Sequence, residues 1–269
     1  MATRTISDYY HYGEPLLIPE GKTSTIFSGH NIANRKPVVI KEILKGDKLR
    51  WSNMGGAKLP LEIVLLTEAS KIKGVAPLHD WFVDPVKFIM VIEKKAANVD
   101  LFDYIGEEGY LSETTAFRVM EQLVGILSDL SAMAILHADI KDENILIDRN
   151  TQKIQLIDFG AGYFYKQEET YTDFLGTWVY SPPEWVLLGH YRAEPALMWS
   201  LGILLYDMVV GDIPFHDGCG IIKGHLVFPP HVSAECISLV RSLLSYRPRD
   251  RPELKNISSF SWWRMHENA

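Results

Sequence analysis

The chain has 269 residues, of which 47% are hydrophobic and 23% charged, so it can bury the core of one large domain or of two lobes. The net charge of −7 disfavours binding to a nucleic-acid backbone and favours basic partners. Two cysteines, Cys219 and Cys236, are too few for a disulfide framework, and the first residues contain no apolar leader, so we expect an intracellular protein, in the cytoplasm or also in the nucleus, with no membrane partner.

The first ninety or so residues predict a small sheet with one helix. The segment 59–70, LPLEIVLLTEAS, has the apolar spacing of a helix and a proline near its start. Short runs rich in β-branched and aromatic residues, separated by turn residues, predict strands at 16–18, 25–29, 37–43 and 86–92.

After Glu93 the pattern becomes mainly helical. Leu111–Leu136 predicts a long amphipathic helix that starts near Ser112 or Glu113, and strand-like runs follow at 145–147 and 154–157. The apolar run Trp199–Val210 is too short to cross a bilayer and is expected to form a buried helix. We therefore expect a two-lobed α+β fold, with a β-rich small lobe over about 12–93, a hinge over about 93–98 and a larger helical lobe over about 99–265.

Residues 18–29, IPEGKTSTIFSG, contain Gly21-Lys22-Thr23, which looks like the end of a phosphate-binding P-loop. That motif needs a glycine five residues before Gly21, and this position is Leu16, so the P-loop pattern fails. The alternative is a strand–turn–strand in which Gly21 makes the turn.

Residues 137–148, HADIKDENILID, place Asp139, Lys141 and Asn144 close together, and Asp158 follows in LIDFG. Phosphoryl transfer from ATP needs a carboxylate that accepts the hydroxyl proton and oxygen ligands that hold Mg²⁺. Asp139 suits the base, Lys141 can steady the transferred phosphate, and Asn144 and Asp158 suit the metal. The alternative for either motif alone is turn formation, for which Asp and Asn are common.

The first part of the chain supplies a complement to these residues. Val38-Val39-Ile40-Lys41 is an apolar strand that ends in a lysine, and Lys41 suits the α- and β-phosphates of a nucleotide. It needs an anion to hold it, and Glu62 lies on the predicted helix 21 residues further on. The alternative is that Lys41 and Glu62 are ordinary solvated charges.

Together these motifs resemble those of protein kinases, since VVIK matches V-A-I-K, HADIKDEN matches H-R-D-x-K-x-x-N, DFG is intact and SPPE stands for A-P-E. Longer stretches, such as LPLEIVLL, DIKDENILID, VYSPPEW and WSLGILLYDMVVGDIPF, resemble Pim-type serine/threonine kinases over nearly the whole chain. The resemblance implies one protein kinase domain over 1–269, a monomer by default. It would transfer the γ-phosphate of Mg-ATP to Ser or Thr hydroxyls of protein substrates. Arg251, in YRPRDRP, would pair with Glu184.

Carried over residue by residue, the resemblance implies a nucleotide site made of Ile18, Gly21, Ile26, Val39, Lys41, Ile92, Glu93, Leu146 and Asp158. Thr177 would bridge toward Asp139 and Lys141. Five acids would line a groove that attracts basic substrate sequences, namely Asp100, Asp103, Glu143, Asp207 and Asp212. The alternatives are plain core packing for the apolar residues and a solvated surface for the acids.

Several positions depart from the kinase pattern. In the loop that covers the phosphates, Pro19 and Ser24 replace the first and third glycines, so we expect weakened ATP affinity. Ala138 replaces the arginine of H-R-D, which receives the phosphate of the activation loop, so we expect activity that does not depend on phosphorylation of that loop. Leu197 and Trp178 also depart from the pattern.

These departures leave a second function open, that of a pseudokinase acting as a binding or regulatory module. Against it, the lysine, the base and the metal-binding aspartate are all present as Lys41, Asp139 and Asp158. Because charge stabilisation dominates phosphoryl transfer, we expect an active enzyme.

Overall fold

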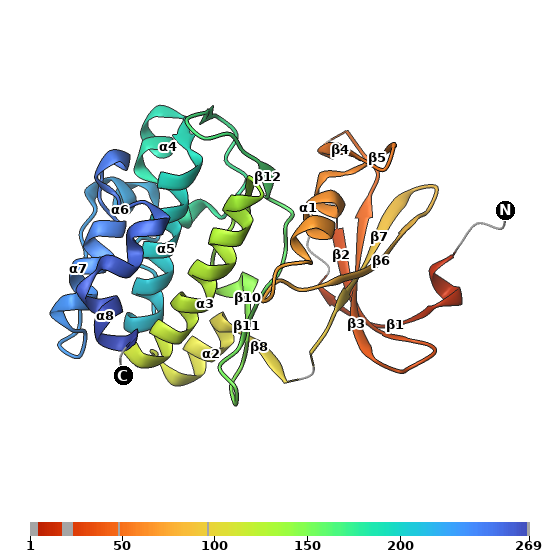
Figure 1. Cartoon of the computed structure of the whole chain (residues 1–269), viewed down its shortest axis with the longest axis horizontal. Coiled ribbons are helices and arrows are strands. Elements are labelled where there is room, and N and C mark those ends of the chain that lie inside the picture. Colours follow the sequence, from red (N-terminus) through yellow and green to blue (C-terminus); the bar gives the residue numbers. More distant parts are fainter. Residues whose placement is uncertain (1–4, 18–23, 48, 96, 268–269) are drawn as a thin grey trace. The chain divides into compact units, whose positions relative to one another are not determined.

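The computed structural model describes residues 5–17, 24–47, 49–95 and 97–267. Contacts divide the chain into two compact units, Met1–Asn98 and Val99–Ala269, which are described here one at a time. Strands dominate the first unit and helices the second (Figure 1), so the predicted α+β class is confirmed. The predicted nucleotide-site residues Ile18 and Gly21 lie outside the described residues, as does Pro19.

A five-stranded sheet forms the centre of unit 1, in the order β1-β2-β3-β7-β6, and every neighbouring pair is antiparallel. Its members are β1 (Tyr10–Leu17), β2 (Ser24–Asn31), β3 (Pro37–Leu44), β6 (Leu78–Val83) and β7 (Lys87–Glu93), after a short 3-10 helix η1 (Ile6–Asp8). From the sequence we predicted only the end of β1, at residues 16–18, and did not predict β6. Both are edge strands, whose turn-type and polar residues, such as Gly13, Pro15 and Asp80, weaken the strand pattern.

One helix, α1 (Leu61–Ala69), accompanies this sheet and follows a hairpin of β4 (Trp51–Met54) and β5 (Ala57–Pro60). Gly55 and Gly56 form the hairpin turn with φ angles of 58° and 80°, as a type I′ turn requires. The helix was predicted to start at residue 59. It starts two residues later because Leu59 and Pro60 pair with strand β4.

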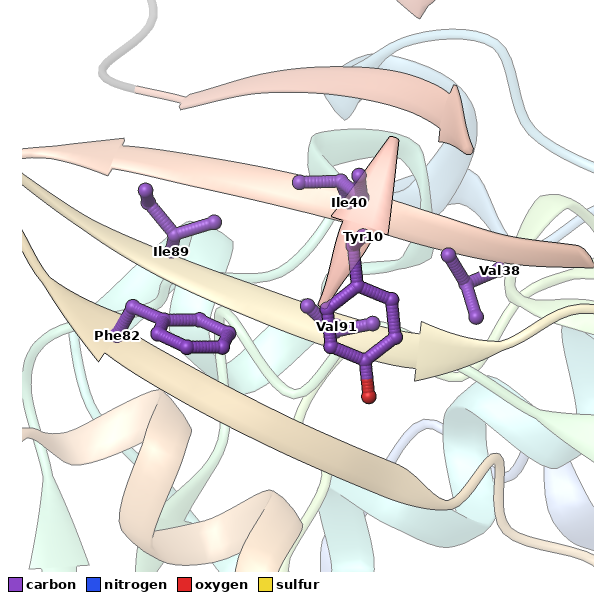
Figure 2. Close-up of a cluster of buried hydrophobic side chains, with 6 residues drawn as sticks. All are labelled: Tyr10, Val38, Ile40, Phe82, Ile89 and Val91. Atoms are coloured by element: carbon purple, nitrogen blue, oxygen red, sulfur yellow. The ribbon is translucent and has the colours of Figure 1, made fainter. Parts of the chain in front are cut away.

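The two faces of the sheet carry different side chains. Figure 2 shows the buried hydrophobic cluster on one face, made of Tyr10, Val38, Ile40, Phe82, Ile89 and Val91. Successive side chains of a strand point to opposite faces. The intervening residues of β3 and β7 therefore occupy the second face, and they include Val39, Lys41 and Ile92.

Unit 2 is built mainly of helices. These are α2 (Leu101–Glu108), α3 (Glu113–Ala132), α4 (Pro183–Leu188), α5 (Ala193–Val210), α6 (Gly218–Lys223), α7 (Ala234–Leu243) and α8 (Ser261–Glu267), with 3-10 helices η2 (Asp142–Asn144), η3 (Trp178–Tyr180), η4 (Pro248–Asp250) and η5 (Leu254–Ser259). Its short strands form small sheets of two or three members, β11-β10-β8, β12-β9 and β13-β14. They are β8 (Asn98–Asp100), β9 (Ile135–Leu136), β10 (Ile145–Asp148), β11 (Ile154–Leu156), β12 (Tyr163–Phe164), β13 (Thr170–Tyr171) and β14 (Tyr191–Arg192).

Helix α3 starts at Glu113, as predicted, but ends at Ala132, four residues earlier than predicted. Ser112 caps its start, since the Ser112 hydroxyl accepts the N–H of Thr115 at 3.2 Å. At the other end Ala134 adopts a left-handed conformation with φ 55°, which ends the helix and lets Ile135 and Leu136 form strand β9.

Helix α5 forms the core of unit 2. It starts six residues before the apolar run at 199–210 and has 18 residues, so by length and composition it could cross a membrane, contrary to the prediction that it is too short. Within the unit, 78% of this helix is buried, which agrees with the prediction of a buried helix and accounts for its apolar sequence.

Glu113, the first residue of α3, joins three helices of unit 2. Its carboxylate accepts the backbone N–H of Ser233 at 2.6 Å and the Ser233 hydroxyl at 2.8 Å, at the start of α7. It also accepts the indole N–H of Trp262, on α8, at 2.7 Å. One side chain therefore fixes two helices that come more than a hundred residues later in the sequence.

Candidate active site

In unit 1, Lys41 on β3 and Glu62 on α1 form a buried ion pair. Lys41 Nζ donates to Glu62 Oε1 at 2.6 Å, and the two side chains are only 8% and 13% exposed. Burial alone would favour the neutral lysine, and the carboxylate opposes that by stabilising the charged form. The structure thus brings these two residues together as the sequence predicted. A fixed ammonium group on this face of the sheet can bind phosphate oxygens.

Three of the predicted nucleotide-site residues share the sheet face of Lys41. Ile26 is the cross-strand partner of Lys41, and Val39 is the partner of Ile92. Side chains of directly opposed residues project to the same side of a sheet. All three side chains are only partly buried, unlike the cluster on the other face, so they offer apolar surface to a flat aromatic ring. Glu93, at the end of β7, is also partly buried.

In unit 2, hydrogen bonds fix both oxygens of the Asp139 carboxylate. Oδ1 accepts the backbone N–H of Thr177 at 2.7 Å, and Oδ2 accepts Nδ2–H of Asn144 at 3.0 Å. Lys141 Nζ lies 3.9 Å from the same Oδ2. The three residues predicted for the catalytic loop therefore meet Thr177 at the carboxylate of Asp139, and Thr177 takes part through its backbone.

The charge of Lys141 is stabilised by several acids. Burial acts to lower the pKa of Lys141, but the carboxylate of Glu143, to which it is hydrogen-bonded, and those of Asp139 and Asp142 outweigh burial and leave the pKa above its usual value. The ammonium therefore stays charged at physiological pH and can neutralise a phosphoryl group.

His137 connects this loop to the strand that leads into Asp158. Its ring is fully buried, Nε2 donates to the carbonyl of Ile157 at 2.9 Å and Nδ1 accepts the N–H of Asp139 at 3.3 Å. Both bonds together require the neutral ring, with its proton on Nε2. In addition, Ile157 N–H donates to the carbonyl of Asn144 at 3.0 Å. These bonds set the position of Asp158 relative to Asp139.

Asp158 has the backbone geometry of a functional residue under strain. Its φ of 62° lies in the left-handed region, which costs energy for any residue but glycine. Oδ1 accepts the N–H of Gly160 at 3.0 Å, while the following Phe159 is fully buried and packs edge-on to His137, with ring centroids 4.8 Å apart. The buried phenylalanine anchors the segment and leaves the Asp158 side chain exposed.

The donor set fits a magnesium ion that also binds phosphate. Both side-chain hydrogen bonds described for Asn144 use Nδ2, so its Oδ1 is left to act as an oxygen ligand beside the exposed carboxylate of Asp158. Within the described residues no three His, Cys, Asp or Glu side chains gather into a metal cage. Mg²⁺ commonly takes one or two protein carboxylates and completes its shell with water and substrate phosphates.

The segment 158–184 ends at a buried ion pair between Glu184, on α4, and Arg251. The guanidinium donates from Nη1 to Oε1 at 2.8 Å and from Nη2 to Oε2 at 2.6 Å. Arg251 also donates to the carbonyls of Pro195 and Ser245, and its guanidinium lies 5.0 Å from the centroid of the Trp199 ring. This pairing anchors the C-terminal end of the segment to the core of unit 2.

Gly176 lets the same segment approach the catalytic loop. A Cβ atom at Gly176 would lie only 2.4 Å from the carbonyl oxygen of Ala138. Because no side chain fits there, the chain can pass close enough for the next N–H, that of Thr177, to reach Asp139.

The comparisons with known proteins agree with this geometry. The family model described as "Protein kinase domain" matches residues 12–263. The chain is 43% identical to the serine/threonine-protein kinase pim-2 of Danio rerio over 256 residues, which are 91% of this chain and 82% of that protein. It is 37% identical to the serine/threonine-protein kinase prk-2 of Caenorhabditis elegans, over 84% of this chain and 52% of that protein.

The chain is a Pim-type member of the protein kinase family. Enzymes of this family use ATP and Mg²⁺, which agrees with the donor set around Asp139, Asn144 and Asp158. Leu146, the remaining predicted nucleotide-site residue of this kinase, lies on β10 between two buried isoleucines and is itself partly exposed.

Four of the five acids predicted to bind substrate lie at the surface of the kinase. Asp103 is exposed, and Glu143 and Asp212 are 56% and 67% exposed. Asp100 is partly exposed and caps α2, since its Oδ1 accepts the N–H of Asp103 at 2.7 Å. These side chains therefore place carboxylates at the surface of unit 2.

The fifth acid, Asp207, differs from the sequence expectation of a groove side chain. It lies on α5, is only 5% exposed, and its Oδ2 has no hydrogen-bond partner among the described residues. Burial, together with the nearby acids Asp142 and Asp212, raises the pKa of Asp207 to about 8. Asp207 is therefore largely protonated at neutral pH and contributes little charge to the surface.

Sequence reasoning did not single out Asp142 and Tyr180, which line the same buried region. Tyr180 Oη donates to Asp142 Oδ1 at 3.2 Å, and burial raises the pKa of Asp142 as well. Asp142 follows directly after Lys141, so the signal was a second acid inside the catalytic motif. Asp142 is buried against Tyr180, which comes 38 residues later in the chain, so the motif alone does not reveal this burial.

Proposed function

We propose that this kinase transfers the γ-phosphate of ATP to Ser or Thr residues that have basic residues close by in the substrate sequence. The observation that carries the proposal is the Asp139 carboxylate, which Thr177 N–H and Asn144 hold in place with the Lys141 ammonium alongside. A carboxylate fixed in this way can orient a substrate hydroxyl and accept its proton.

Each of the proposed catalytic and binding side chains has a separate task. Mg-ATP, when bound, supplies the phosphoryl group and the metal charge that offsets its oxygens. Asn144 and Asp158 would hold the metal, and Lys41, fixed by Glu62, would bind phosphate oxygens. Lys141 would stabilise the negative charge that develops on the transferred group.

The preference for basic sequences is supported by the charge of the chain and by its exposed acids. The net charge is −7, and Asp103, Glu143 and Asp212 carry carboxylates at the surface of unit 2. Opposite charges at a surface steer a partner and disfavour acidic competitors. The pseudokinase alternative rests on Pro19, Ser24, Ala138 and Leu197, and none of the contacts in the site favours it over an active enzyme.

The test measures labelled phosphate transfer from Mg-ATP to two Ser peptides that are identical except that the basic residues of one are acidic in the other. We expect transfer to the basic peptide, little to the acidic one, and loss of transfer in Asp139→Asn by a factor of about 10² to 10⁴, the range typical of a general base. Asp158→Asn controls for contaminating kinases.

Equal transfer to both peptides would refute the basic preference while leaving the kinase activity in place. Transfer to neither peptide, with ATP binding also absent in a thermal-shift assay, would favour the pseudokinase.

A further inference from the structure

One end of the sheet in unit 1 carries apolar side chains that the proposed reaction does not use. Trp51 opens strand β4 and is 39% exposed. Val83 and Val86, at the turn between β6 and β7, are 50% and 63% exposed. Large apolar side chains that are exposed together mark a surface that meets another molecule.

The buried ring of Phe88, on β7, joins two of these side chains. Trp51 packs edge-on against Phe88, with ring centroids 5.7 Å apart. Val83 is the cross-strand partner of Phe88, so both side chains project to the same face of the sheet. Trp51 and Val83 therefore flank one ring.

Two lysines border this apolar patch. Lys45 N–H donates to the carbonyl of Val86 at 2.9 Å, and the Lys45 ammonium lies 5.0 Å from the centroid of the Phe88 ring. The Lys58 ammonium lies 5.3 Å from the centroid of the Trp51 ring. Both lysines are exposed, and no ion pair joins either of them to another of the residues that the structure describes. Each ammonium is therefore placed beside an aromatic ring and can still pair with an acid.

The charge of unit 1 indicates the sign of the partner. Residues 1–98 contain 14 Lys and Arg against 10 Asp and Glu, whereas residues 99–269 contain 13 against 24. Unit 1 is thus net positive although the whole chain is negative. Complementary charge steers association and disfavours partners of the wrong sign, so this surface suits an acidic partner.

We propose that the patch made of Lys45, Trp51, Lys58, Val83 and Val86, called the hairpin surface below, binds an acidic segment of a partner protein. Carboxylates of that segment would accept hydrogen bonds from the two ammonium groups. Its apolar side chains would cover the indole and the two valines. An aromatic anchor with charged groups at its rim is the usual arrangement of a protein–protein interface.

A protein segment fits the hairpin surface better than an anionic membrane does. Asp47 is exposed two residues after Lys45, and Asp84 lies in the turn between Val83 and Val86, so a dense layer of lipid phosphates would meet repulsion there. A short segment can place its acids beside the lysines and avoid both aspartates. The excess of acids in unit 2 also opposes a negative bilayer.

The test measures the fluorescence anisotropy of a short labelled peptide in which pairs of Glu alternate with single Leu residues, added to the purified chain without ATP. The peptide has no side-chain hydroxyl, so it is not a phosphorylation substrate. We expect saturable binding that weakens between about 0.01 M and 0.15 M salt, because the screening length falls from about 30 Å to about 8 Å. Peptides with Lys in place of Glu, or with Asn in place of Leu, should bind about tenfold more weakly or less.

Charge reversal in the protein locates the binding site. Lys45→Glu/Lys58→Glu should weaken binding of the Glu-Leu peptide by about tenfold or more. The matched control is Lys36→Glu/Lys73→Glu, which changes the net charge of unit 1 equally at two exposed lysines outside the patch and should change the Kd far less.

Two further variants test the apolar part of the surface. Trp51→Ala should weaken peptide binding because it removes the aromatic anchor. If Trp51→Ala loses the hairpin of β4 and β5, Val86→Ser gives the same test at a side chain that is mostly exposed, and it should also weaken binding while the Tm stays unchanged.

Equal loss of binding in the two charge-reversed pairs would overturn the proposal, because the attraction would then come from net charge alone. Absence of binding by the Glu-Leu peptide would also overturn it. So would sedimentation with vesicles of phosphatidylserine and phosphatidylcholine that Lys45→Glu/Lys58→Glu abolishes, since the surface would then belong to a membrane contact.

Discussion

Arg251 binds both carboxylate oxygens of Glu184 across 67 residues of sequence, at 2.8 and 2.6 Å, with almost no exposure of either side chain. Removing one member of such a pair leaves an uncompensated charge inside the protein. We expect Arg251→Met to lower the free energy of unfolding by about 3–5 kcal/mol, measured by urea denaturation.

Two variants serve as controls for that prediction. Arg249→Met removes a neighbouring arginine whose side chain is 76% exposed and should change stability little. The double variant Arg251→Met/Glu184→Leu removes both charges and should recover part of the loss. A double variant less stable than Arg251→Met would contradict this account of the pair.

The buried carboxyl of Asp207 predicts a specific dependence of stability on pH. Burial and nearby acids raise its pKa from the usual 3.8 of an aspartate to about 8, so the folded protein binds a proton that the unfolded chain has released. Stability is then highest below the pKa of the unfolded chain and falls as the pH rises toward 8. Urea unfolding at pH 5 and pH 8 should show this loss, and Asp207→Asn should reduce it.

Asp103→Asn is the control, since this exposed acid is not among the groups that raise the pKa of Asp207 and should leave the pH dependence almost unchanged. Identical pH profiles for the parent chain and Asp207→Asn would show that Asp207 is already charged in the folded state.

Gly176→Ala tests whether the approach of the segment to the catalytic loop matters for activity. The new methyl group would meet the backbone carbonyl of Ala138, which cannot rotate away, so the segment must shift and weaken the bond from Thr177 N–H to Asp139. We expect kcat for peptide phosphorylation to fall at least tenfold while the Tm changes by a few degrees.

Gly106→Ala is a suitable control, because a Cβ at that position meets nothing within 4 Å. Full activity of Gly176→Ala would mean that the segment can retreat without disturbing Asp139.

Residues 18–29 stand where other kinases have the loop that covers the phosphates, and restoring the two missing glycines tests their effect on ATP affinity. Pro19 and Ser24 stand where kinases carry glycine, so restoring both residues should make more backbone N–H groups available to phosphate. We expect the double variant Pro19→Gly/Ser24→Gly to bind ATP more tightly, measured by isothermal titration calorimetry. An unchanged Kd would show that this loop does not limit nucleotide affinity.

Motifs in the sequence suggested candidate members of the site because each motif joins a role to a local sequence. Lys41 follows three apolar residues within strand β3, and Asp139 and Asn144 lie five residues apart, so the proximity of these last two follows from chain geometry. The partnership of Lys41 with Glu62 was also predictable, because the helix pattern around Glu62 supplied an acid near the strand.

Other features depend on packing between distant segments, which no local pattern reveals. In the sequence, Asp207 cannot be told from an ordinary acid of a helix. In the structure, helix α5 is buried on nearly all sides, and the carboxyl of Asp207 is buried near Asp142. The pairing of Thr170 with Arg192 joins strands of two residues each, too short for an alternating pattern to appear.

The contacts of Glu113 bear on the order in which the kinase folds during synthesis. The ribosome adds roughly 5–20 residues per second, and N-terminal domains generally fold first. Unit 1 has all its residues by position 98, so it can complete its sheet early. Unit 2 cannot satisfy the Glu113 carboxylate until Trp262 has been made, 149 residues later. Its core helices therefore emerge well before their last partner, so unit 2 can complete its packing only after α8 has been made.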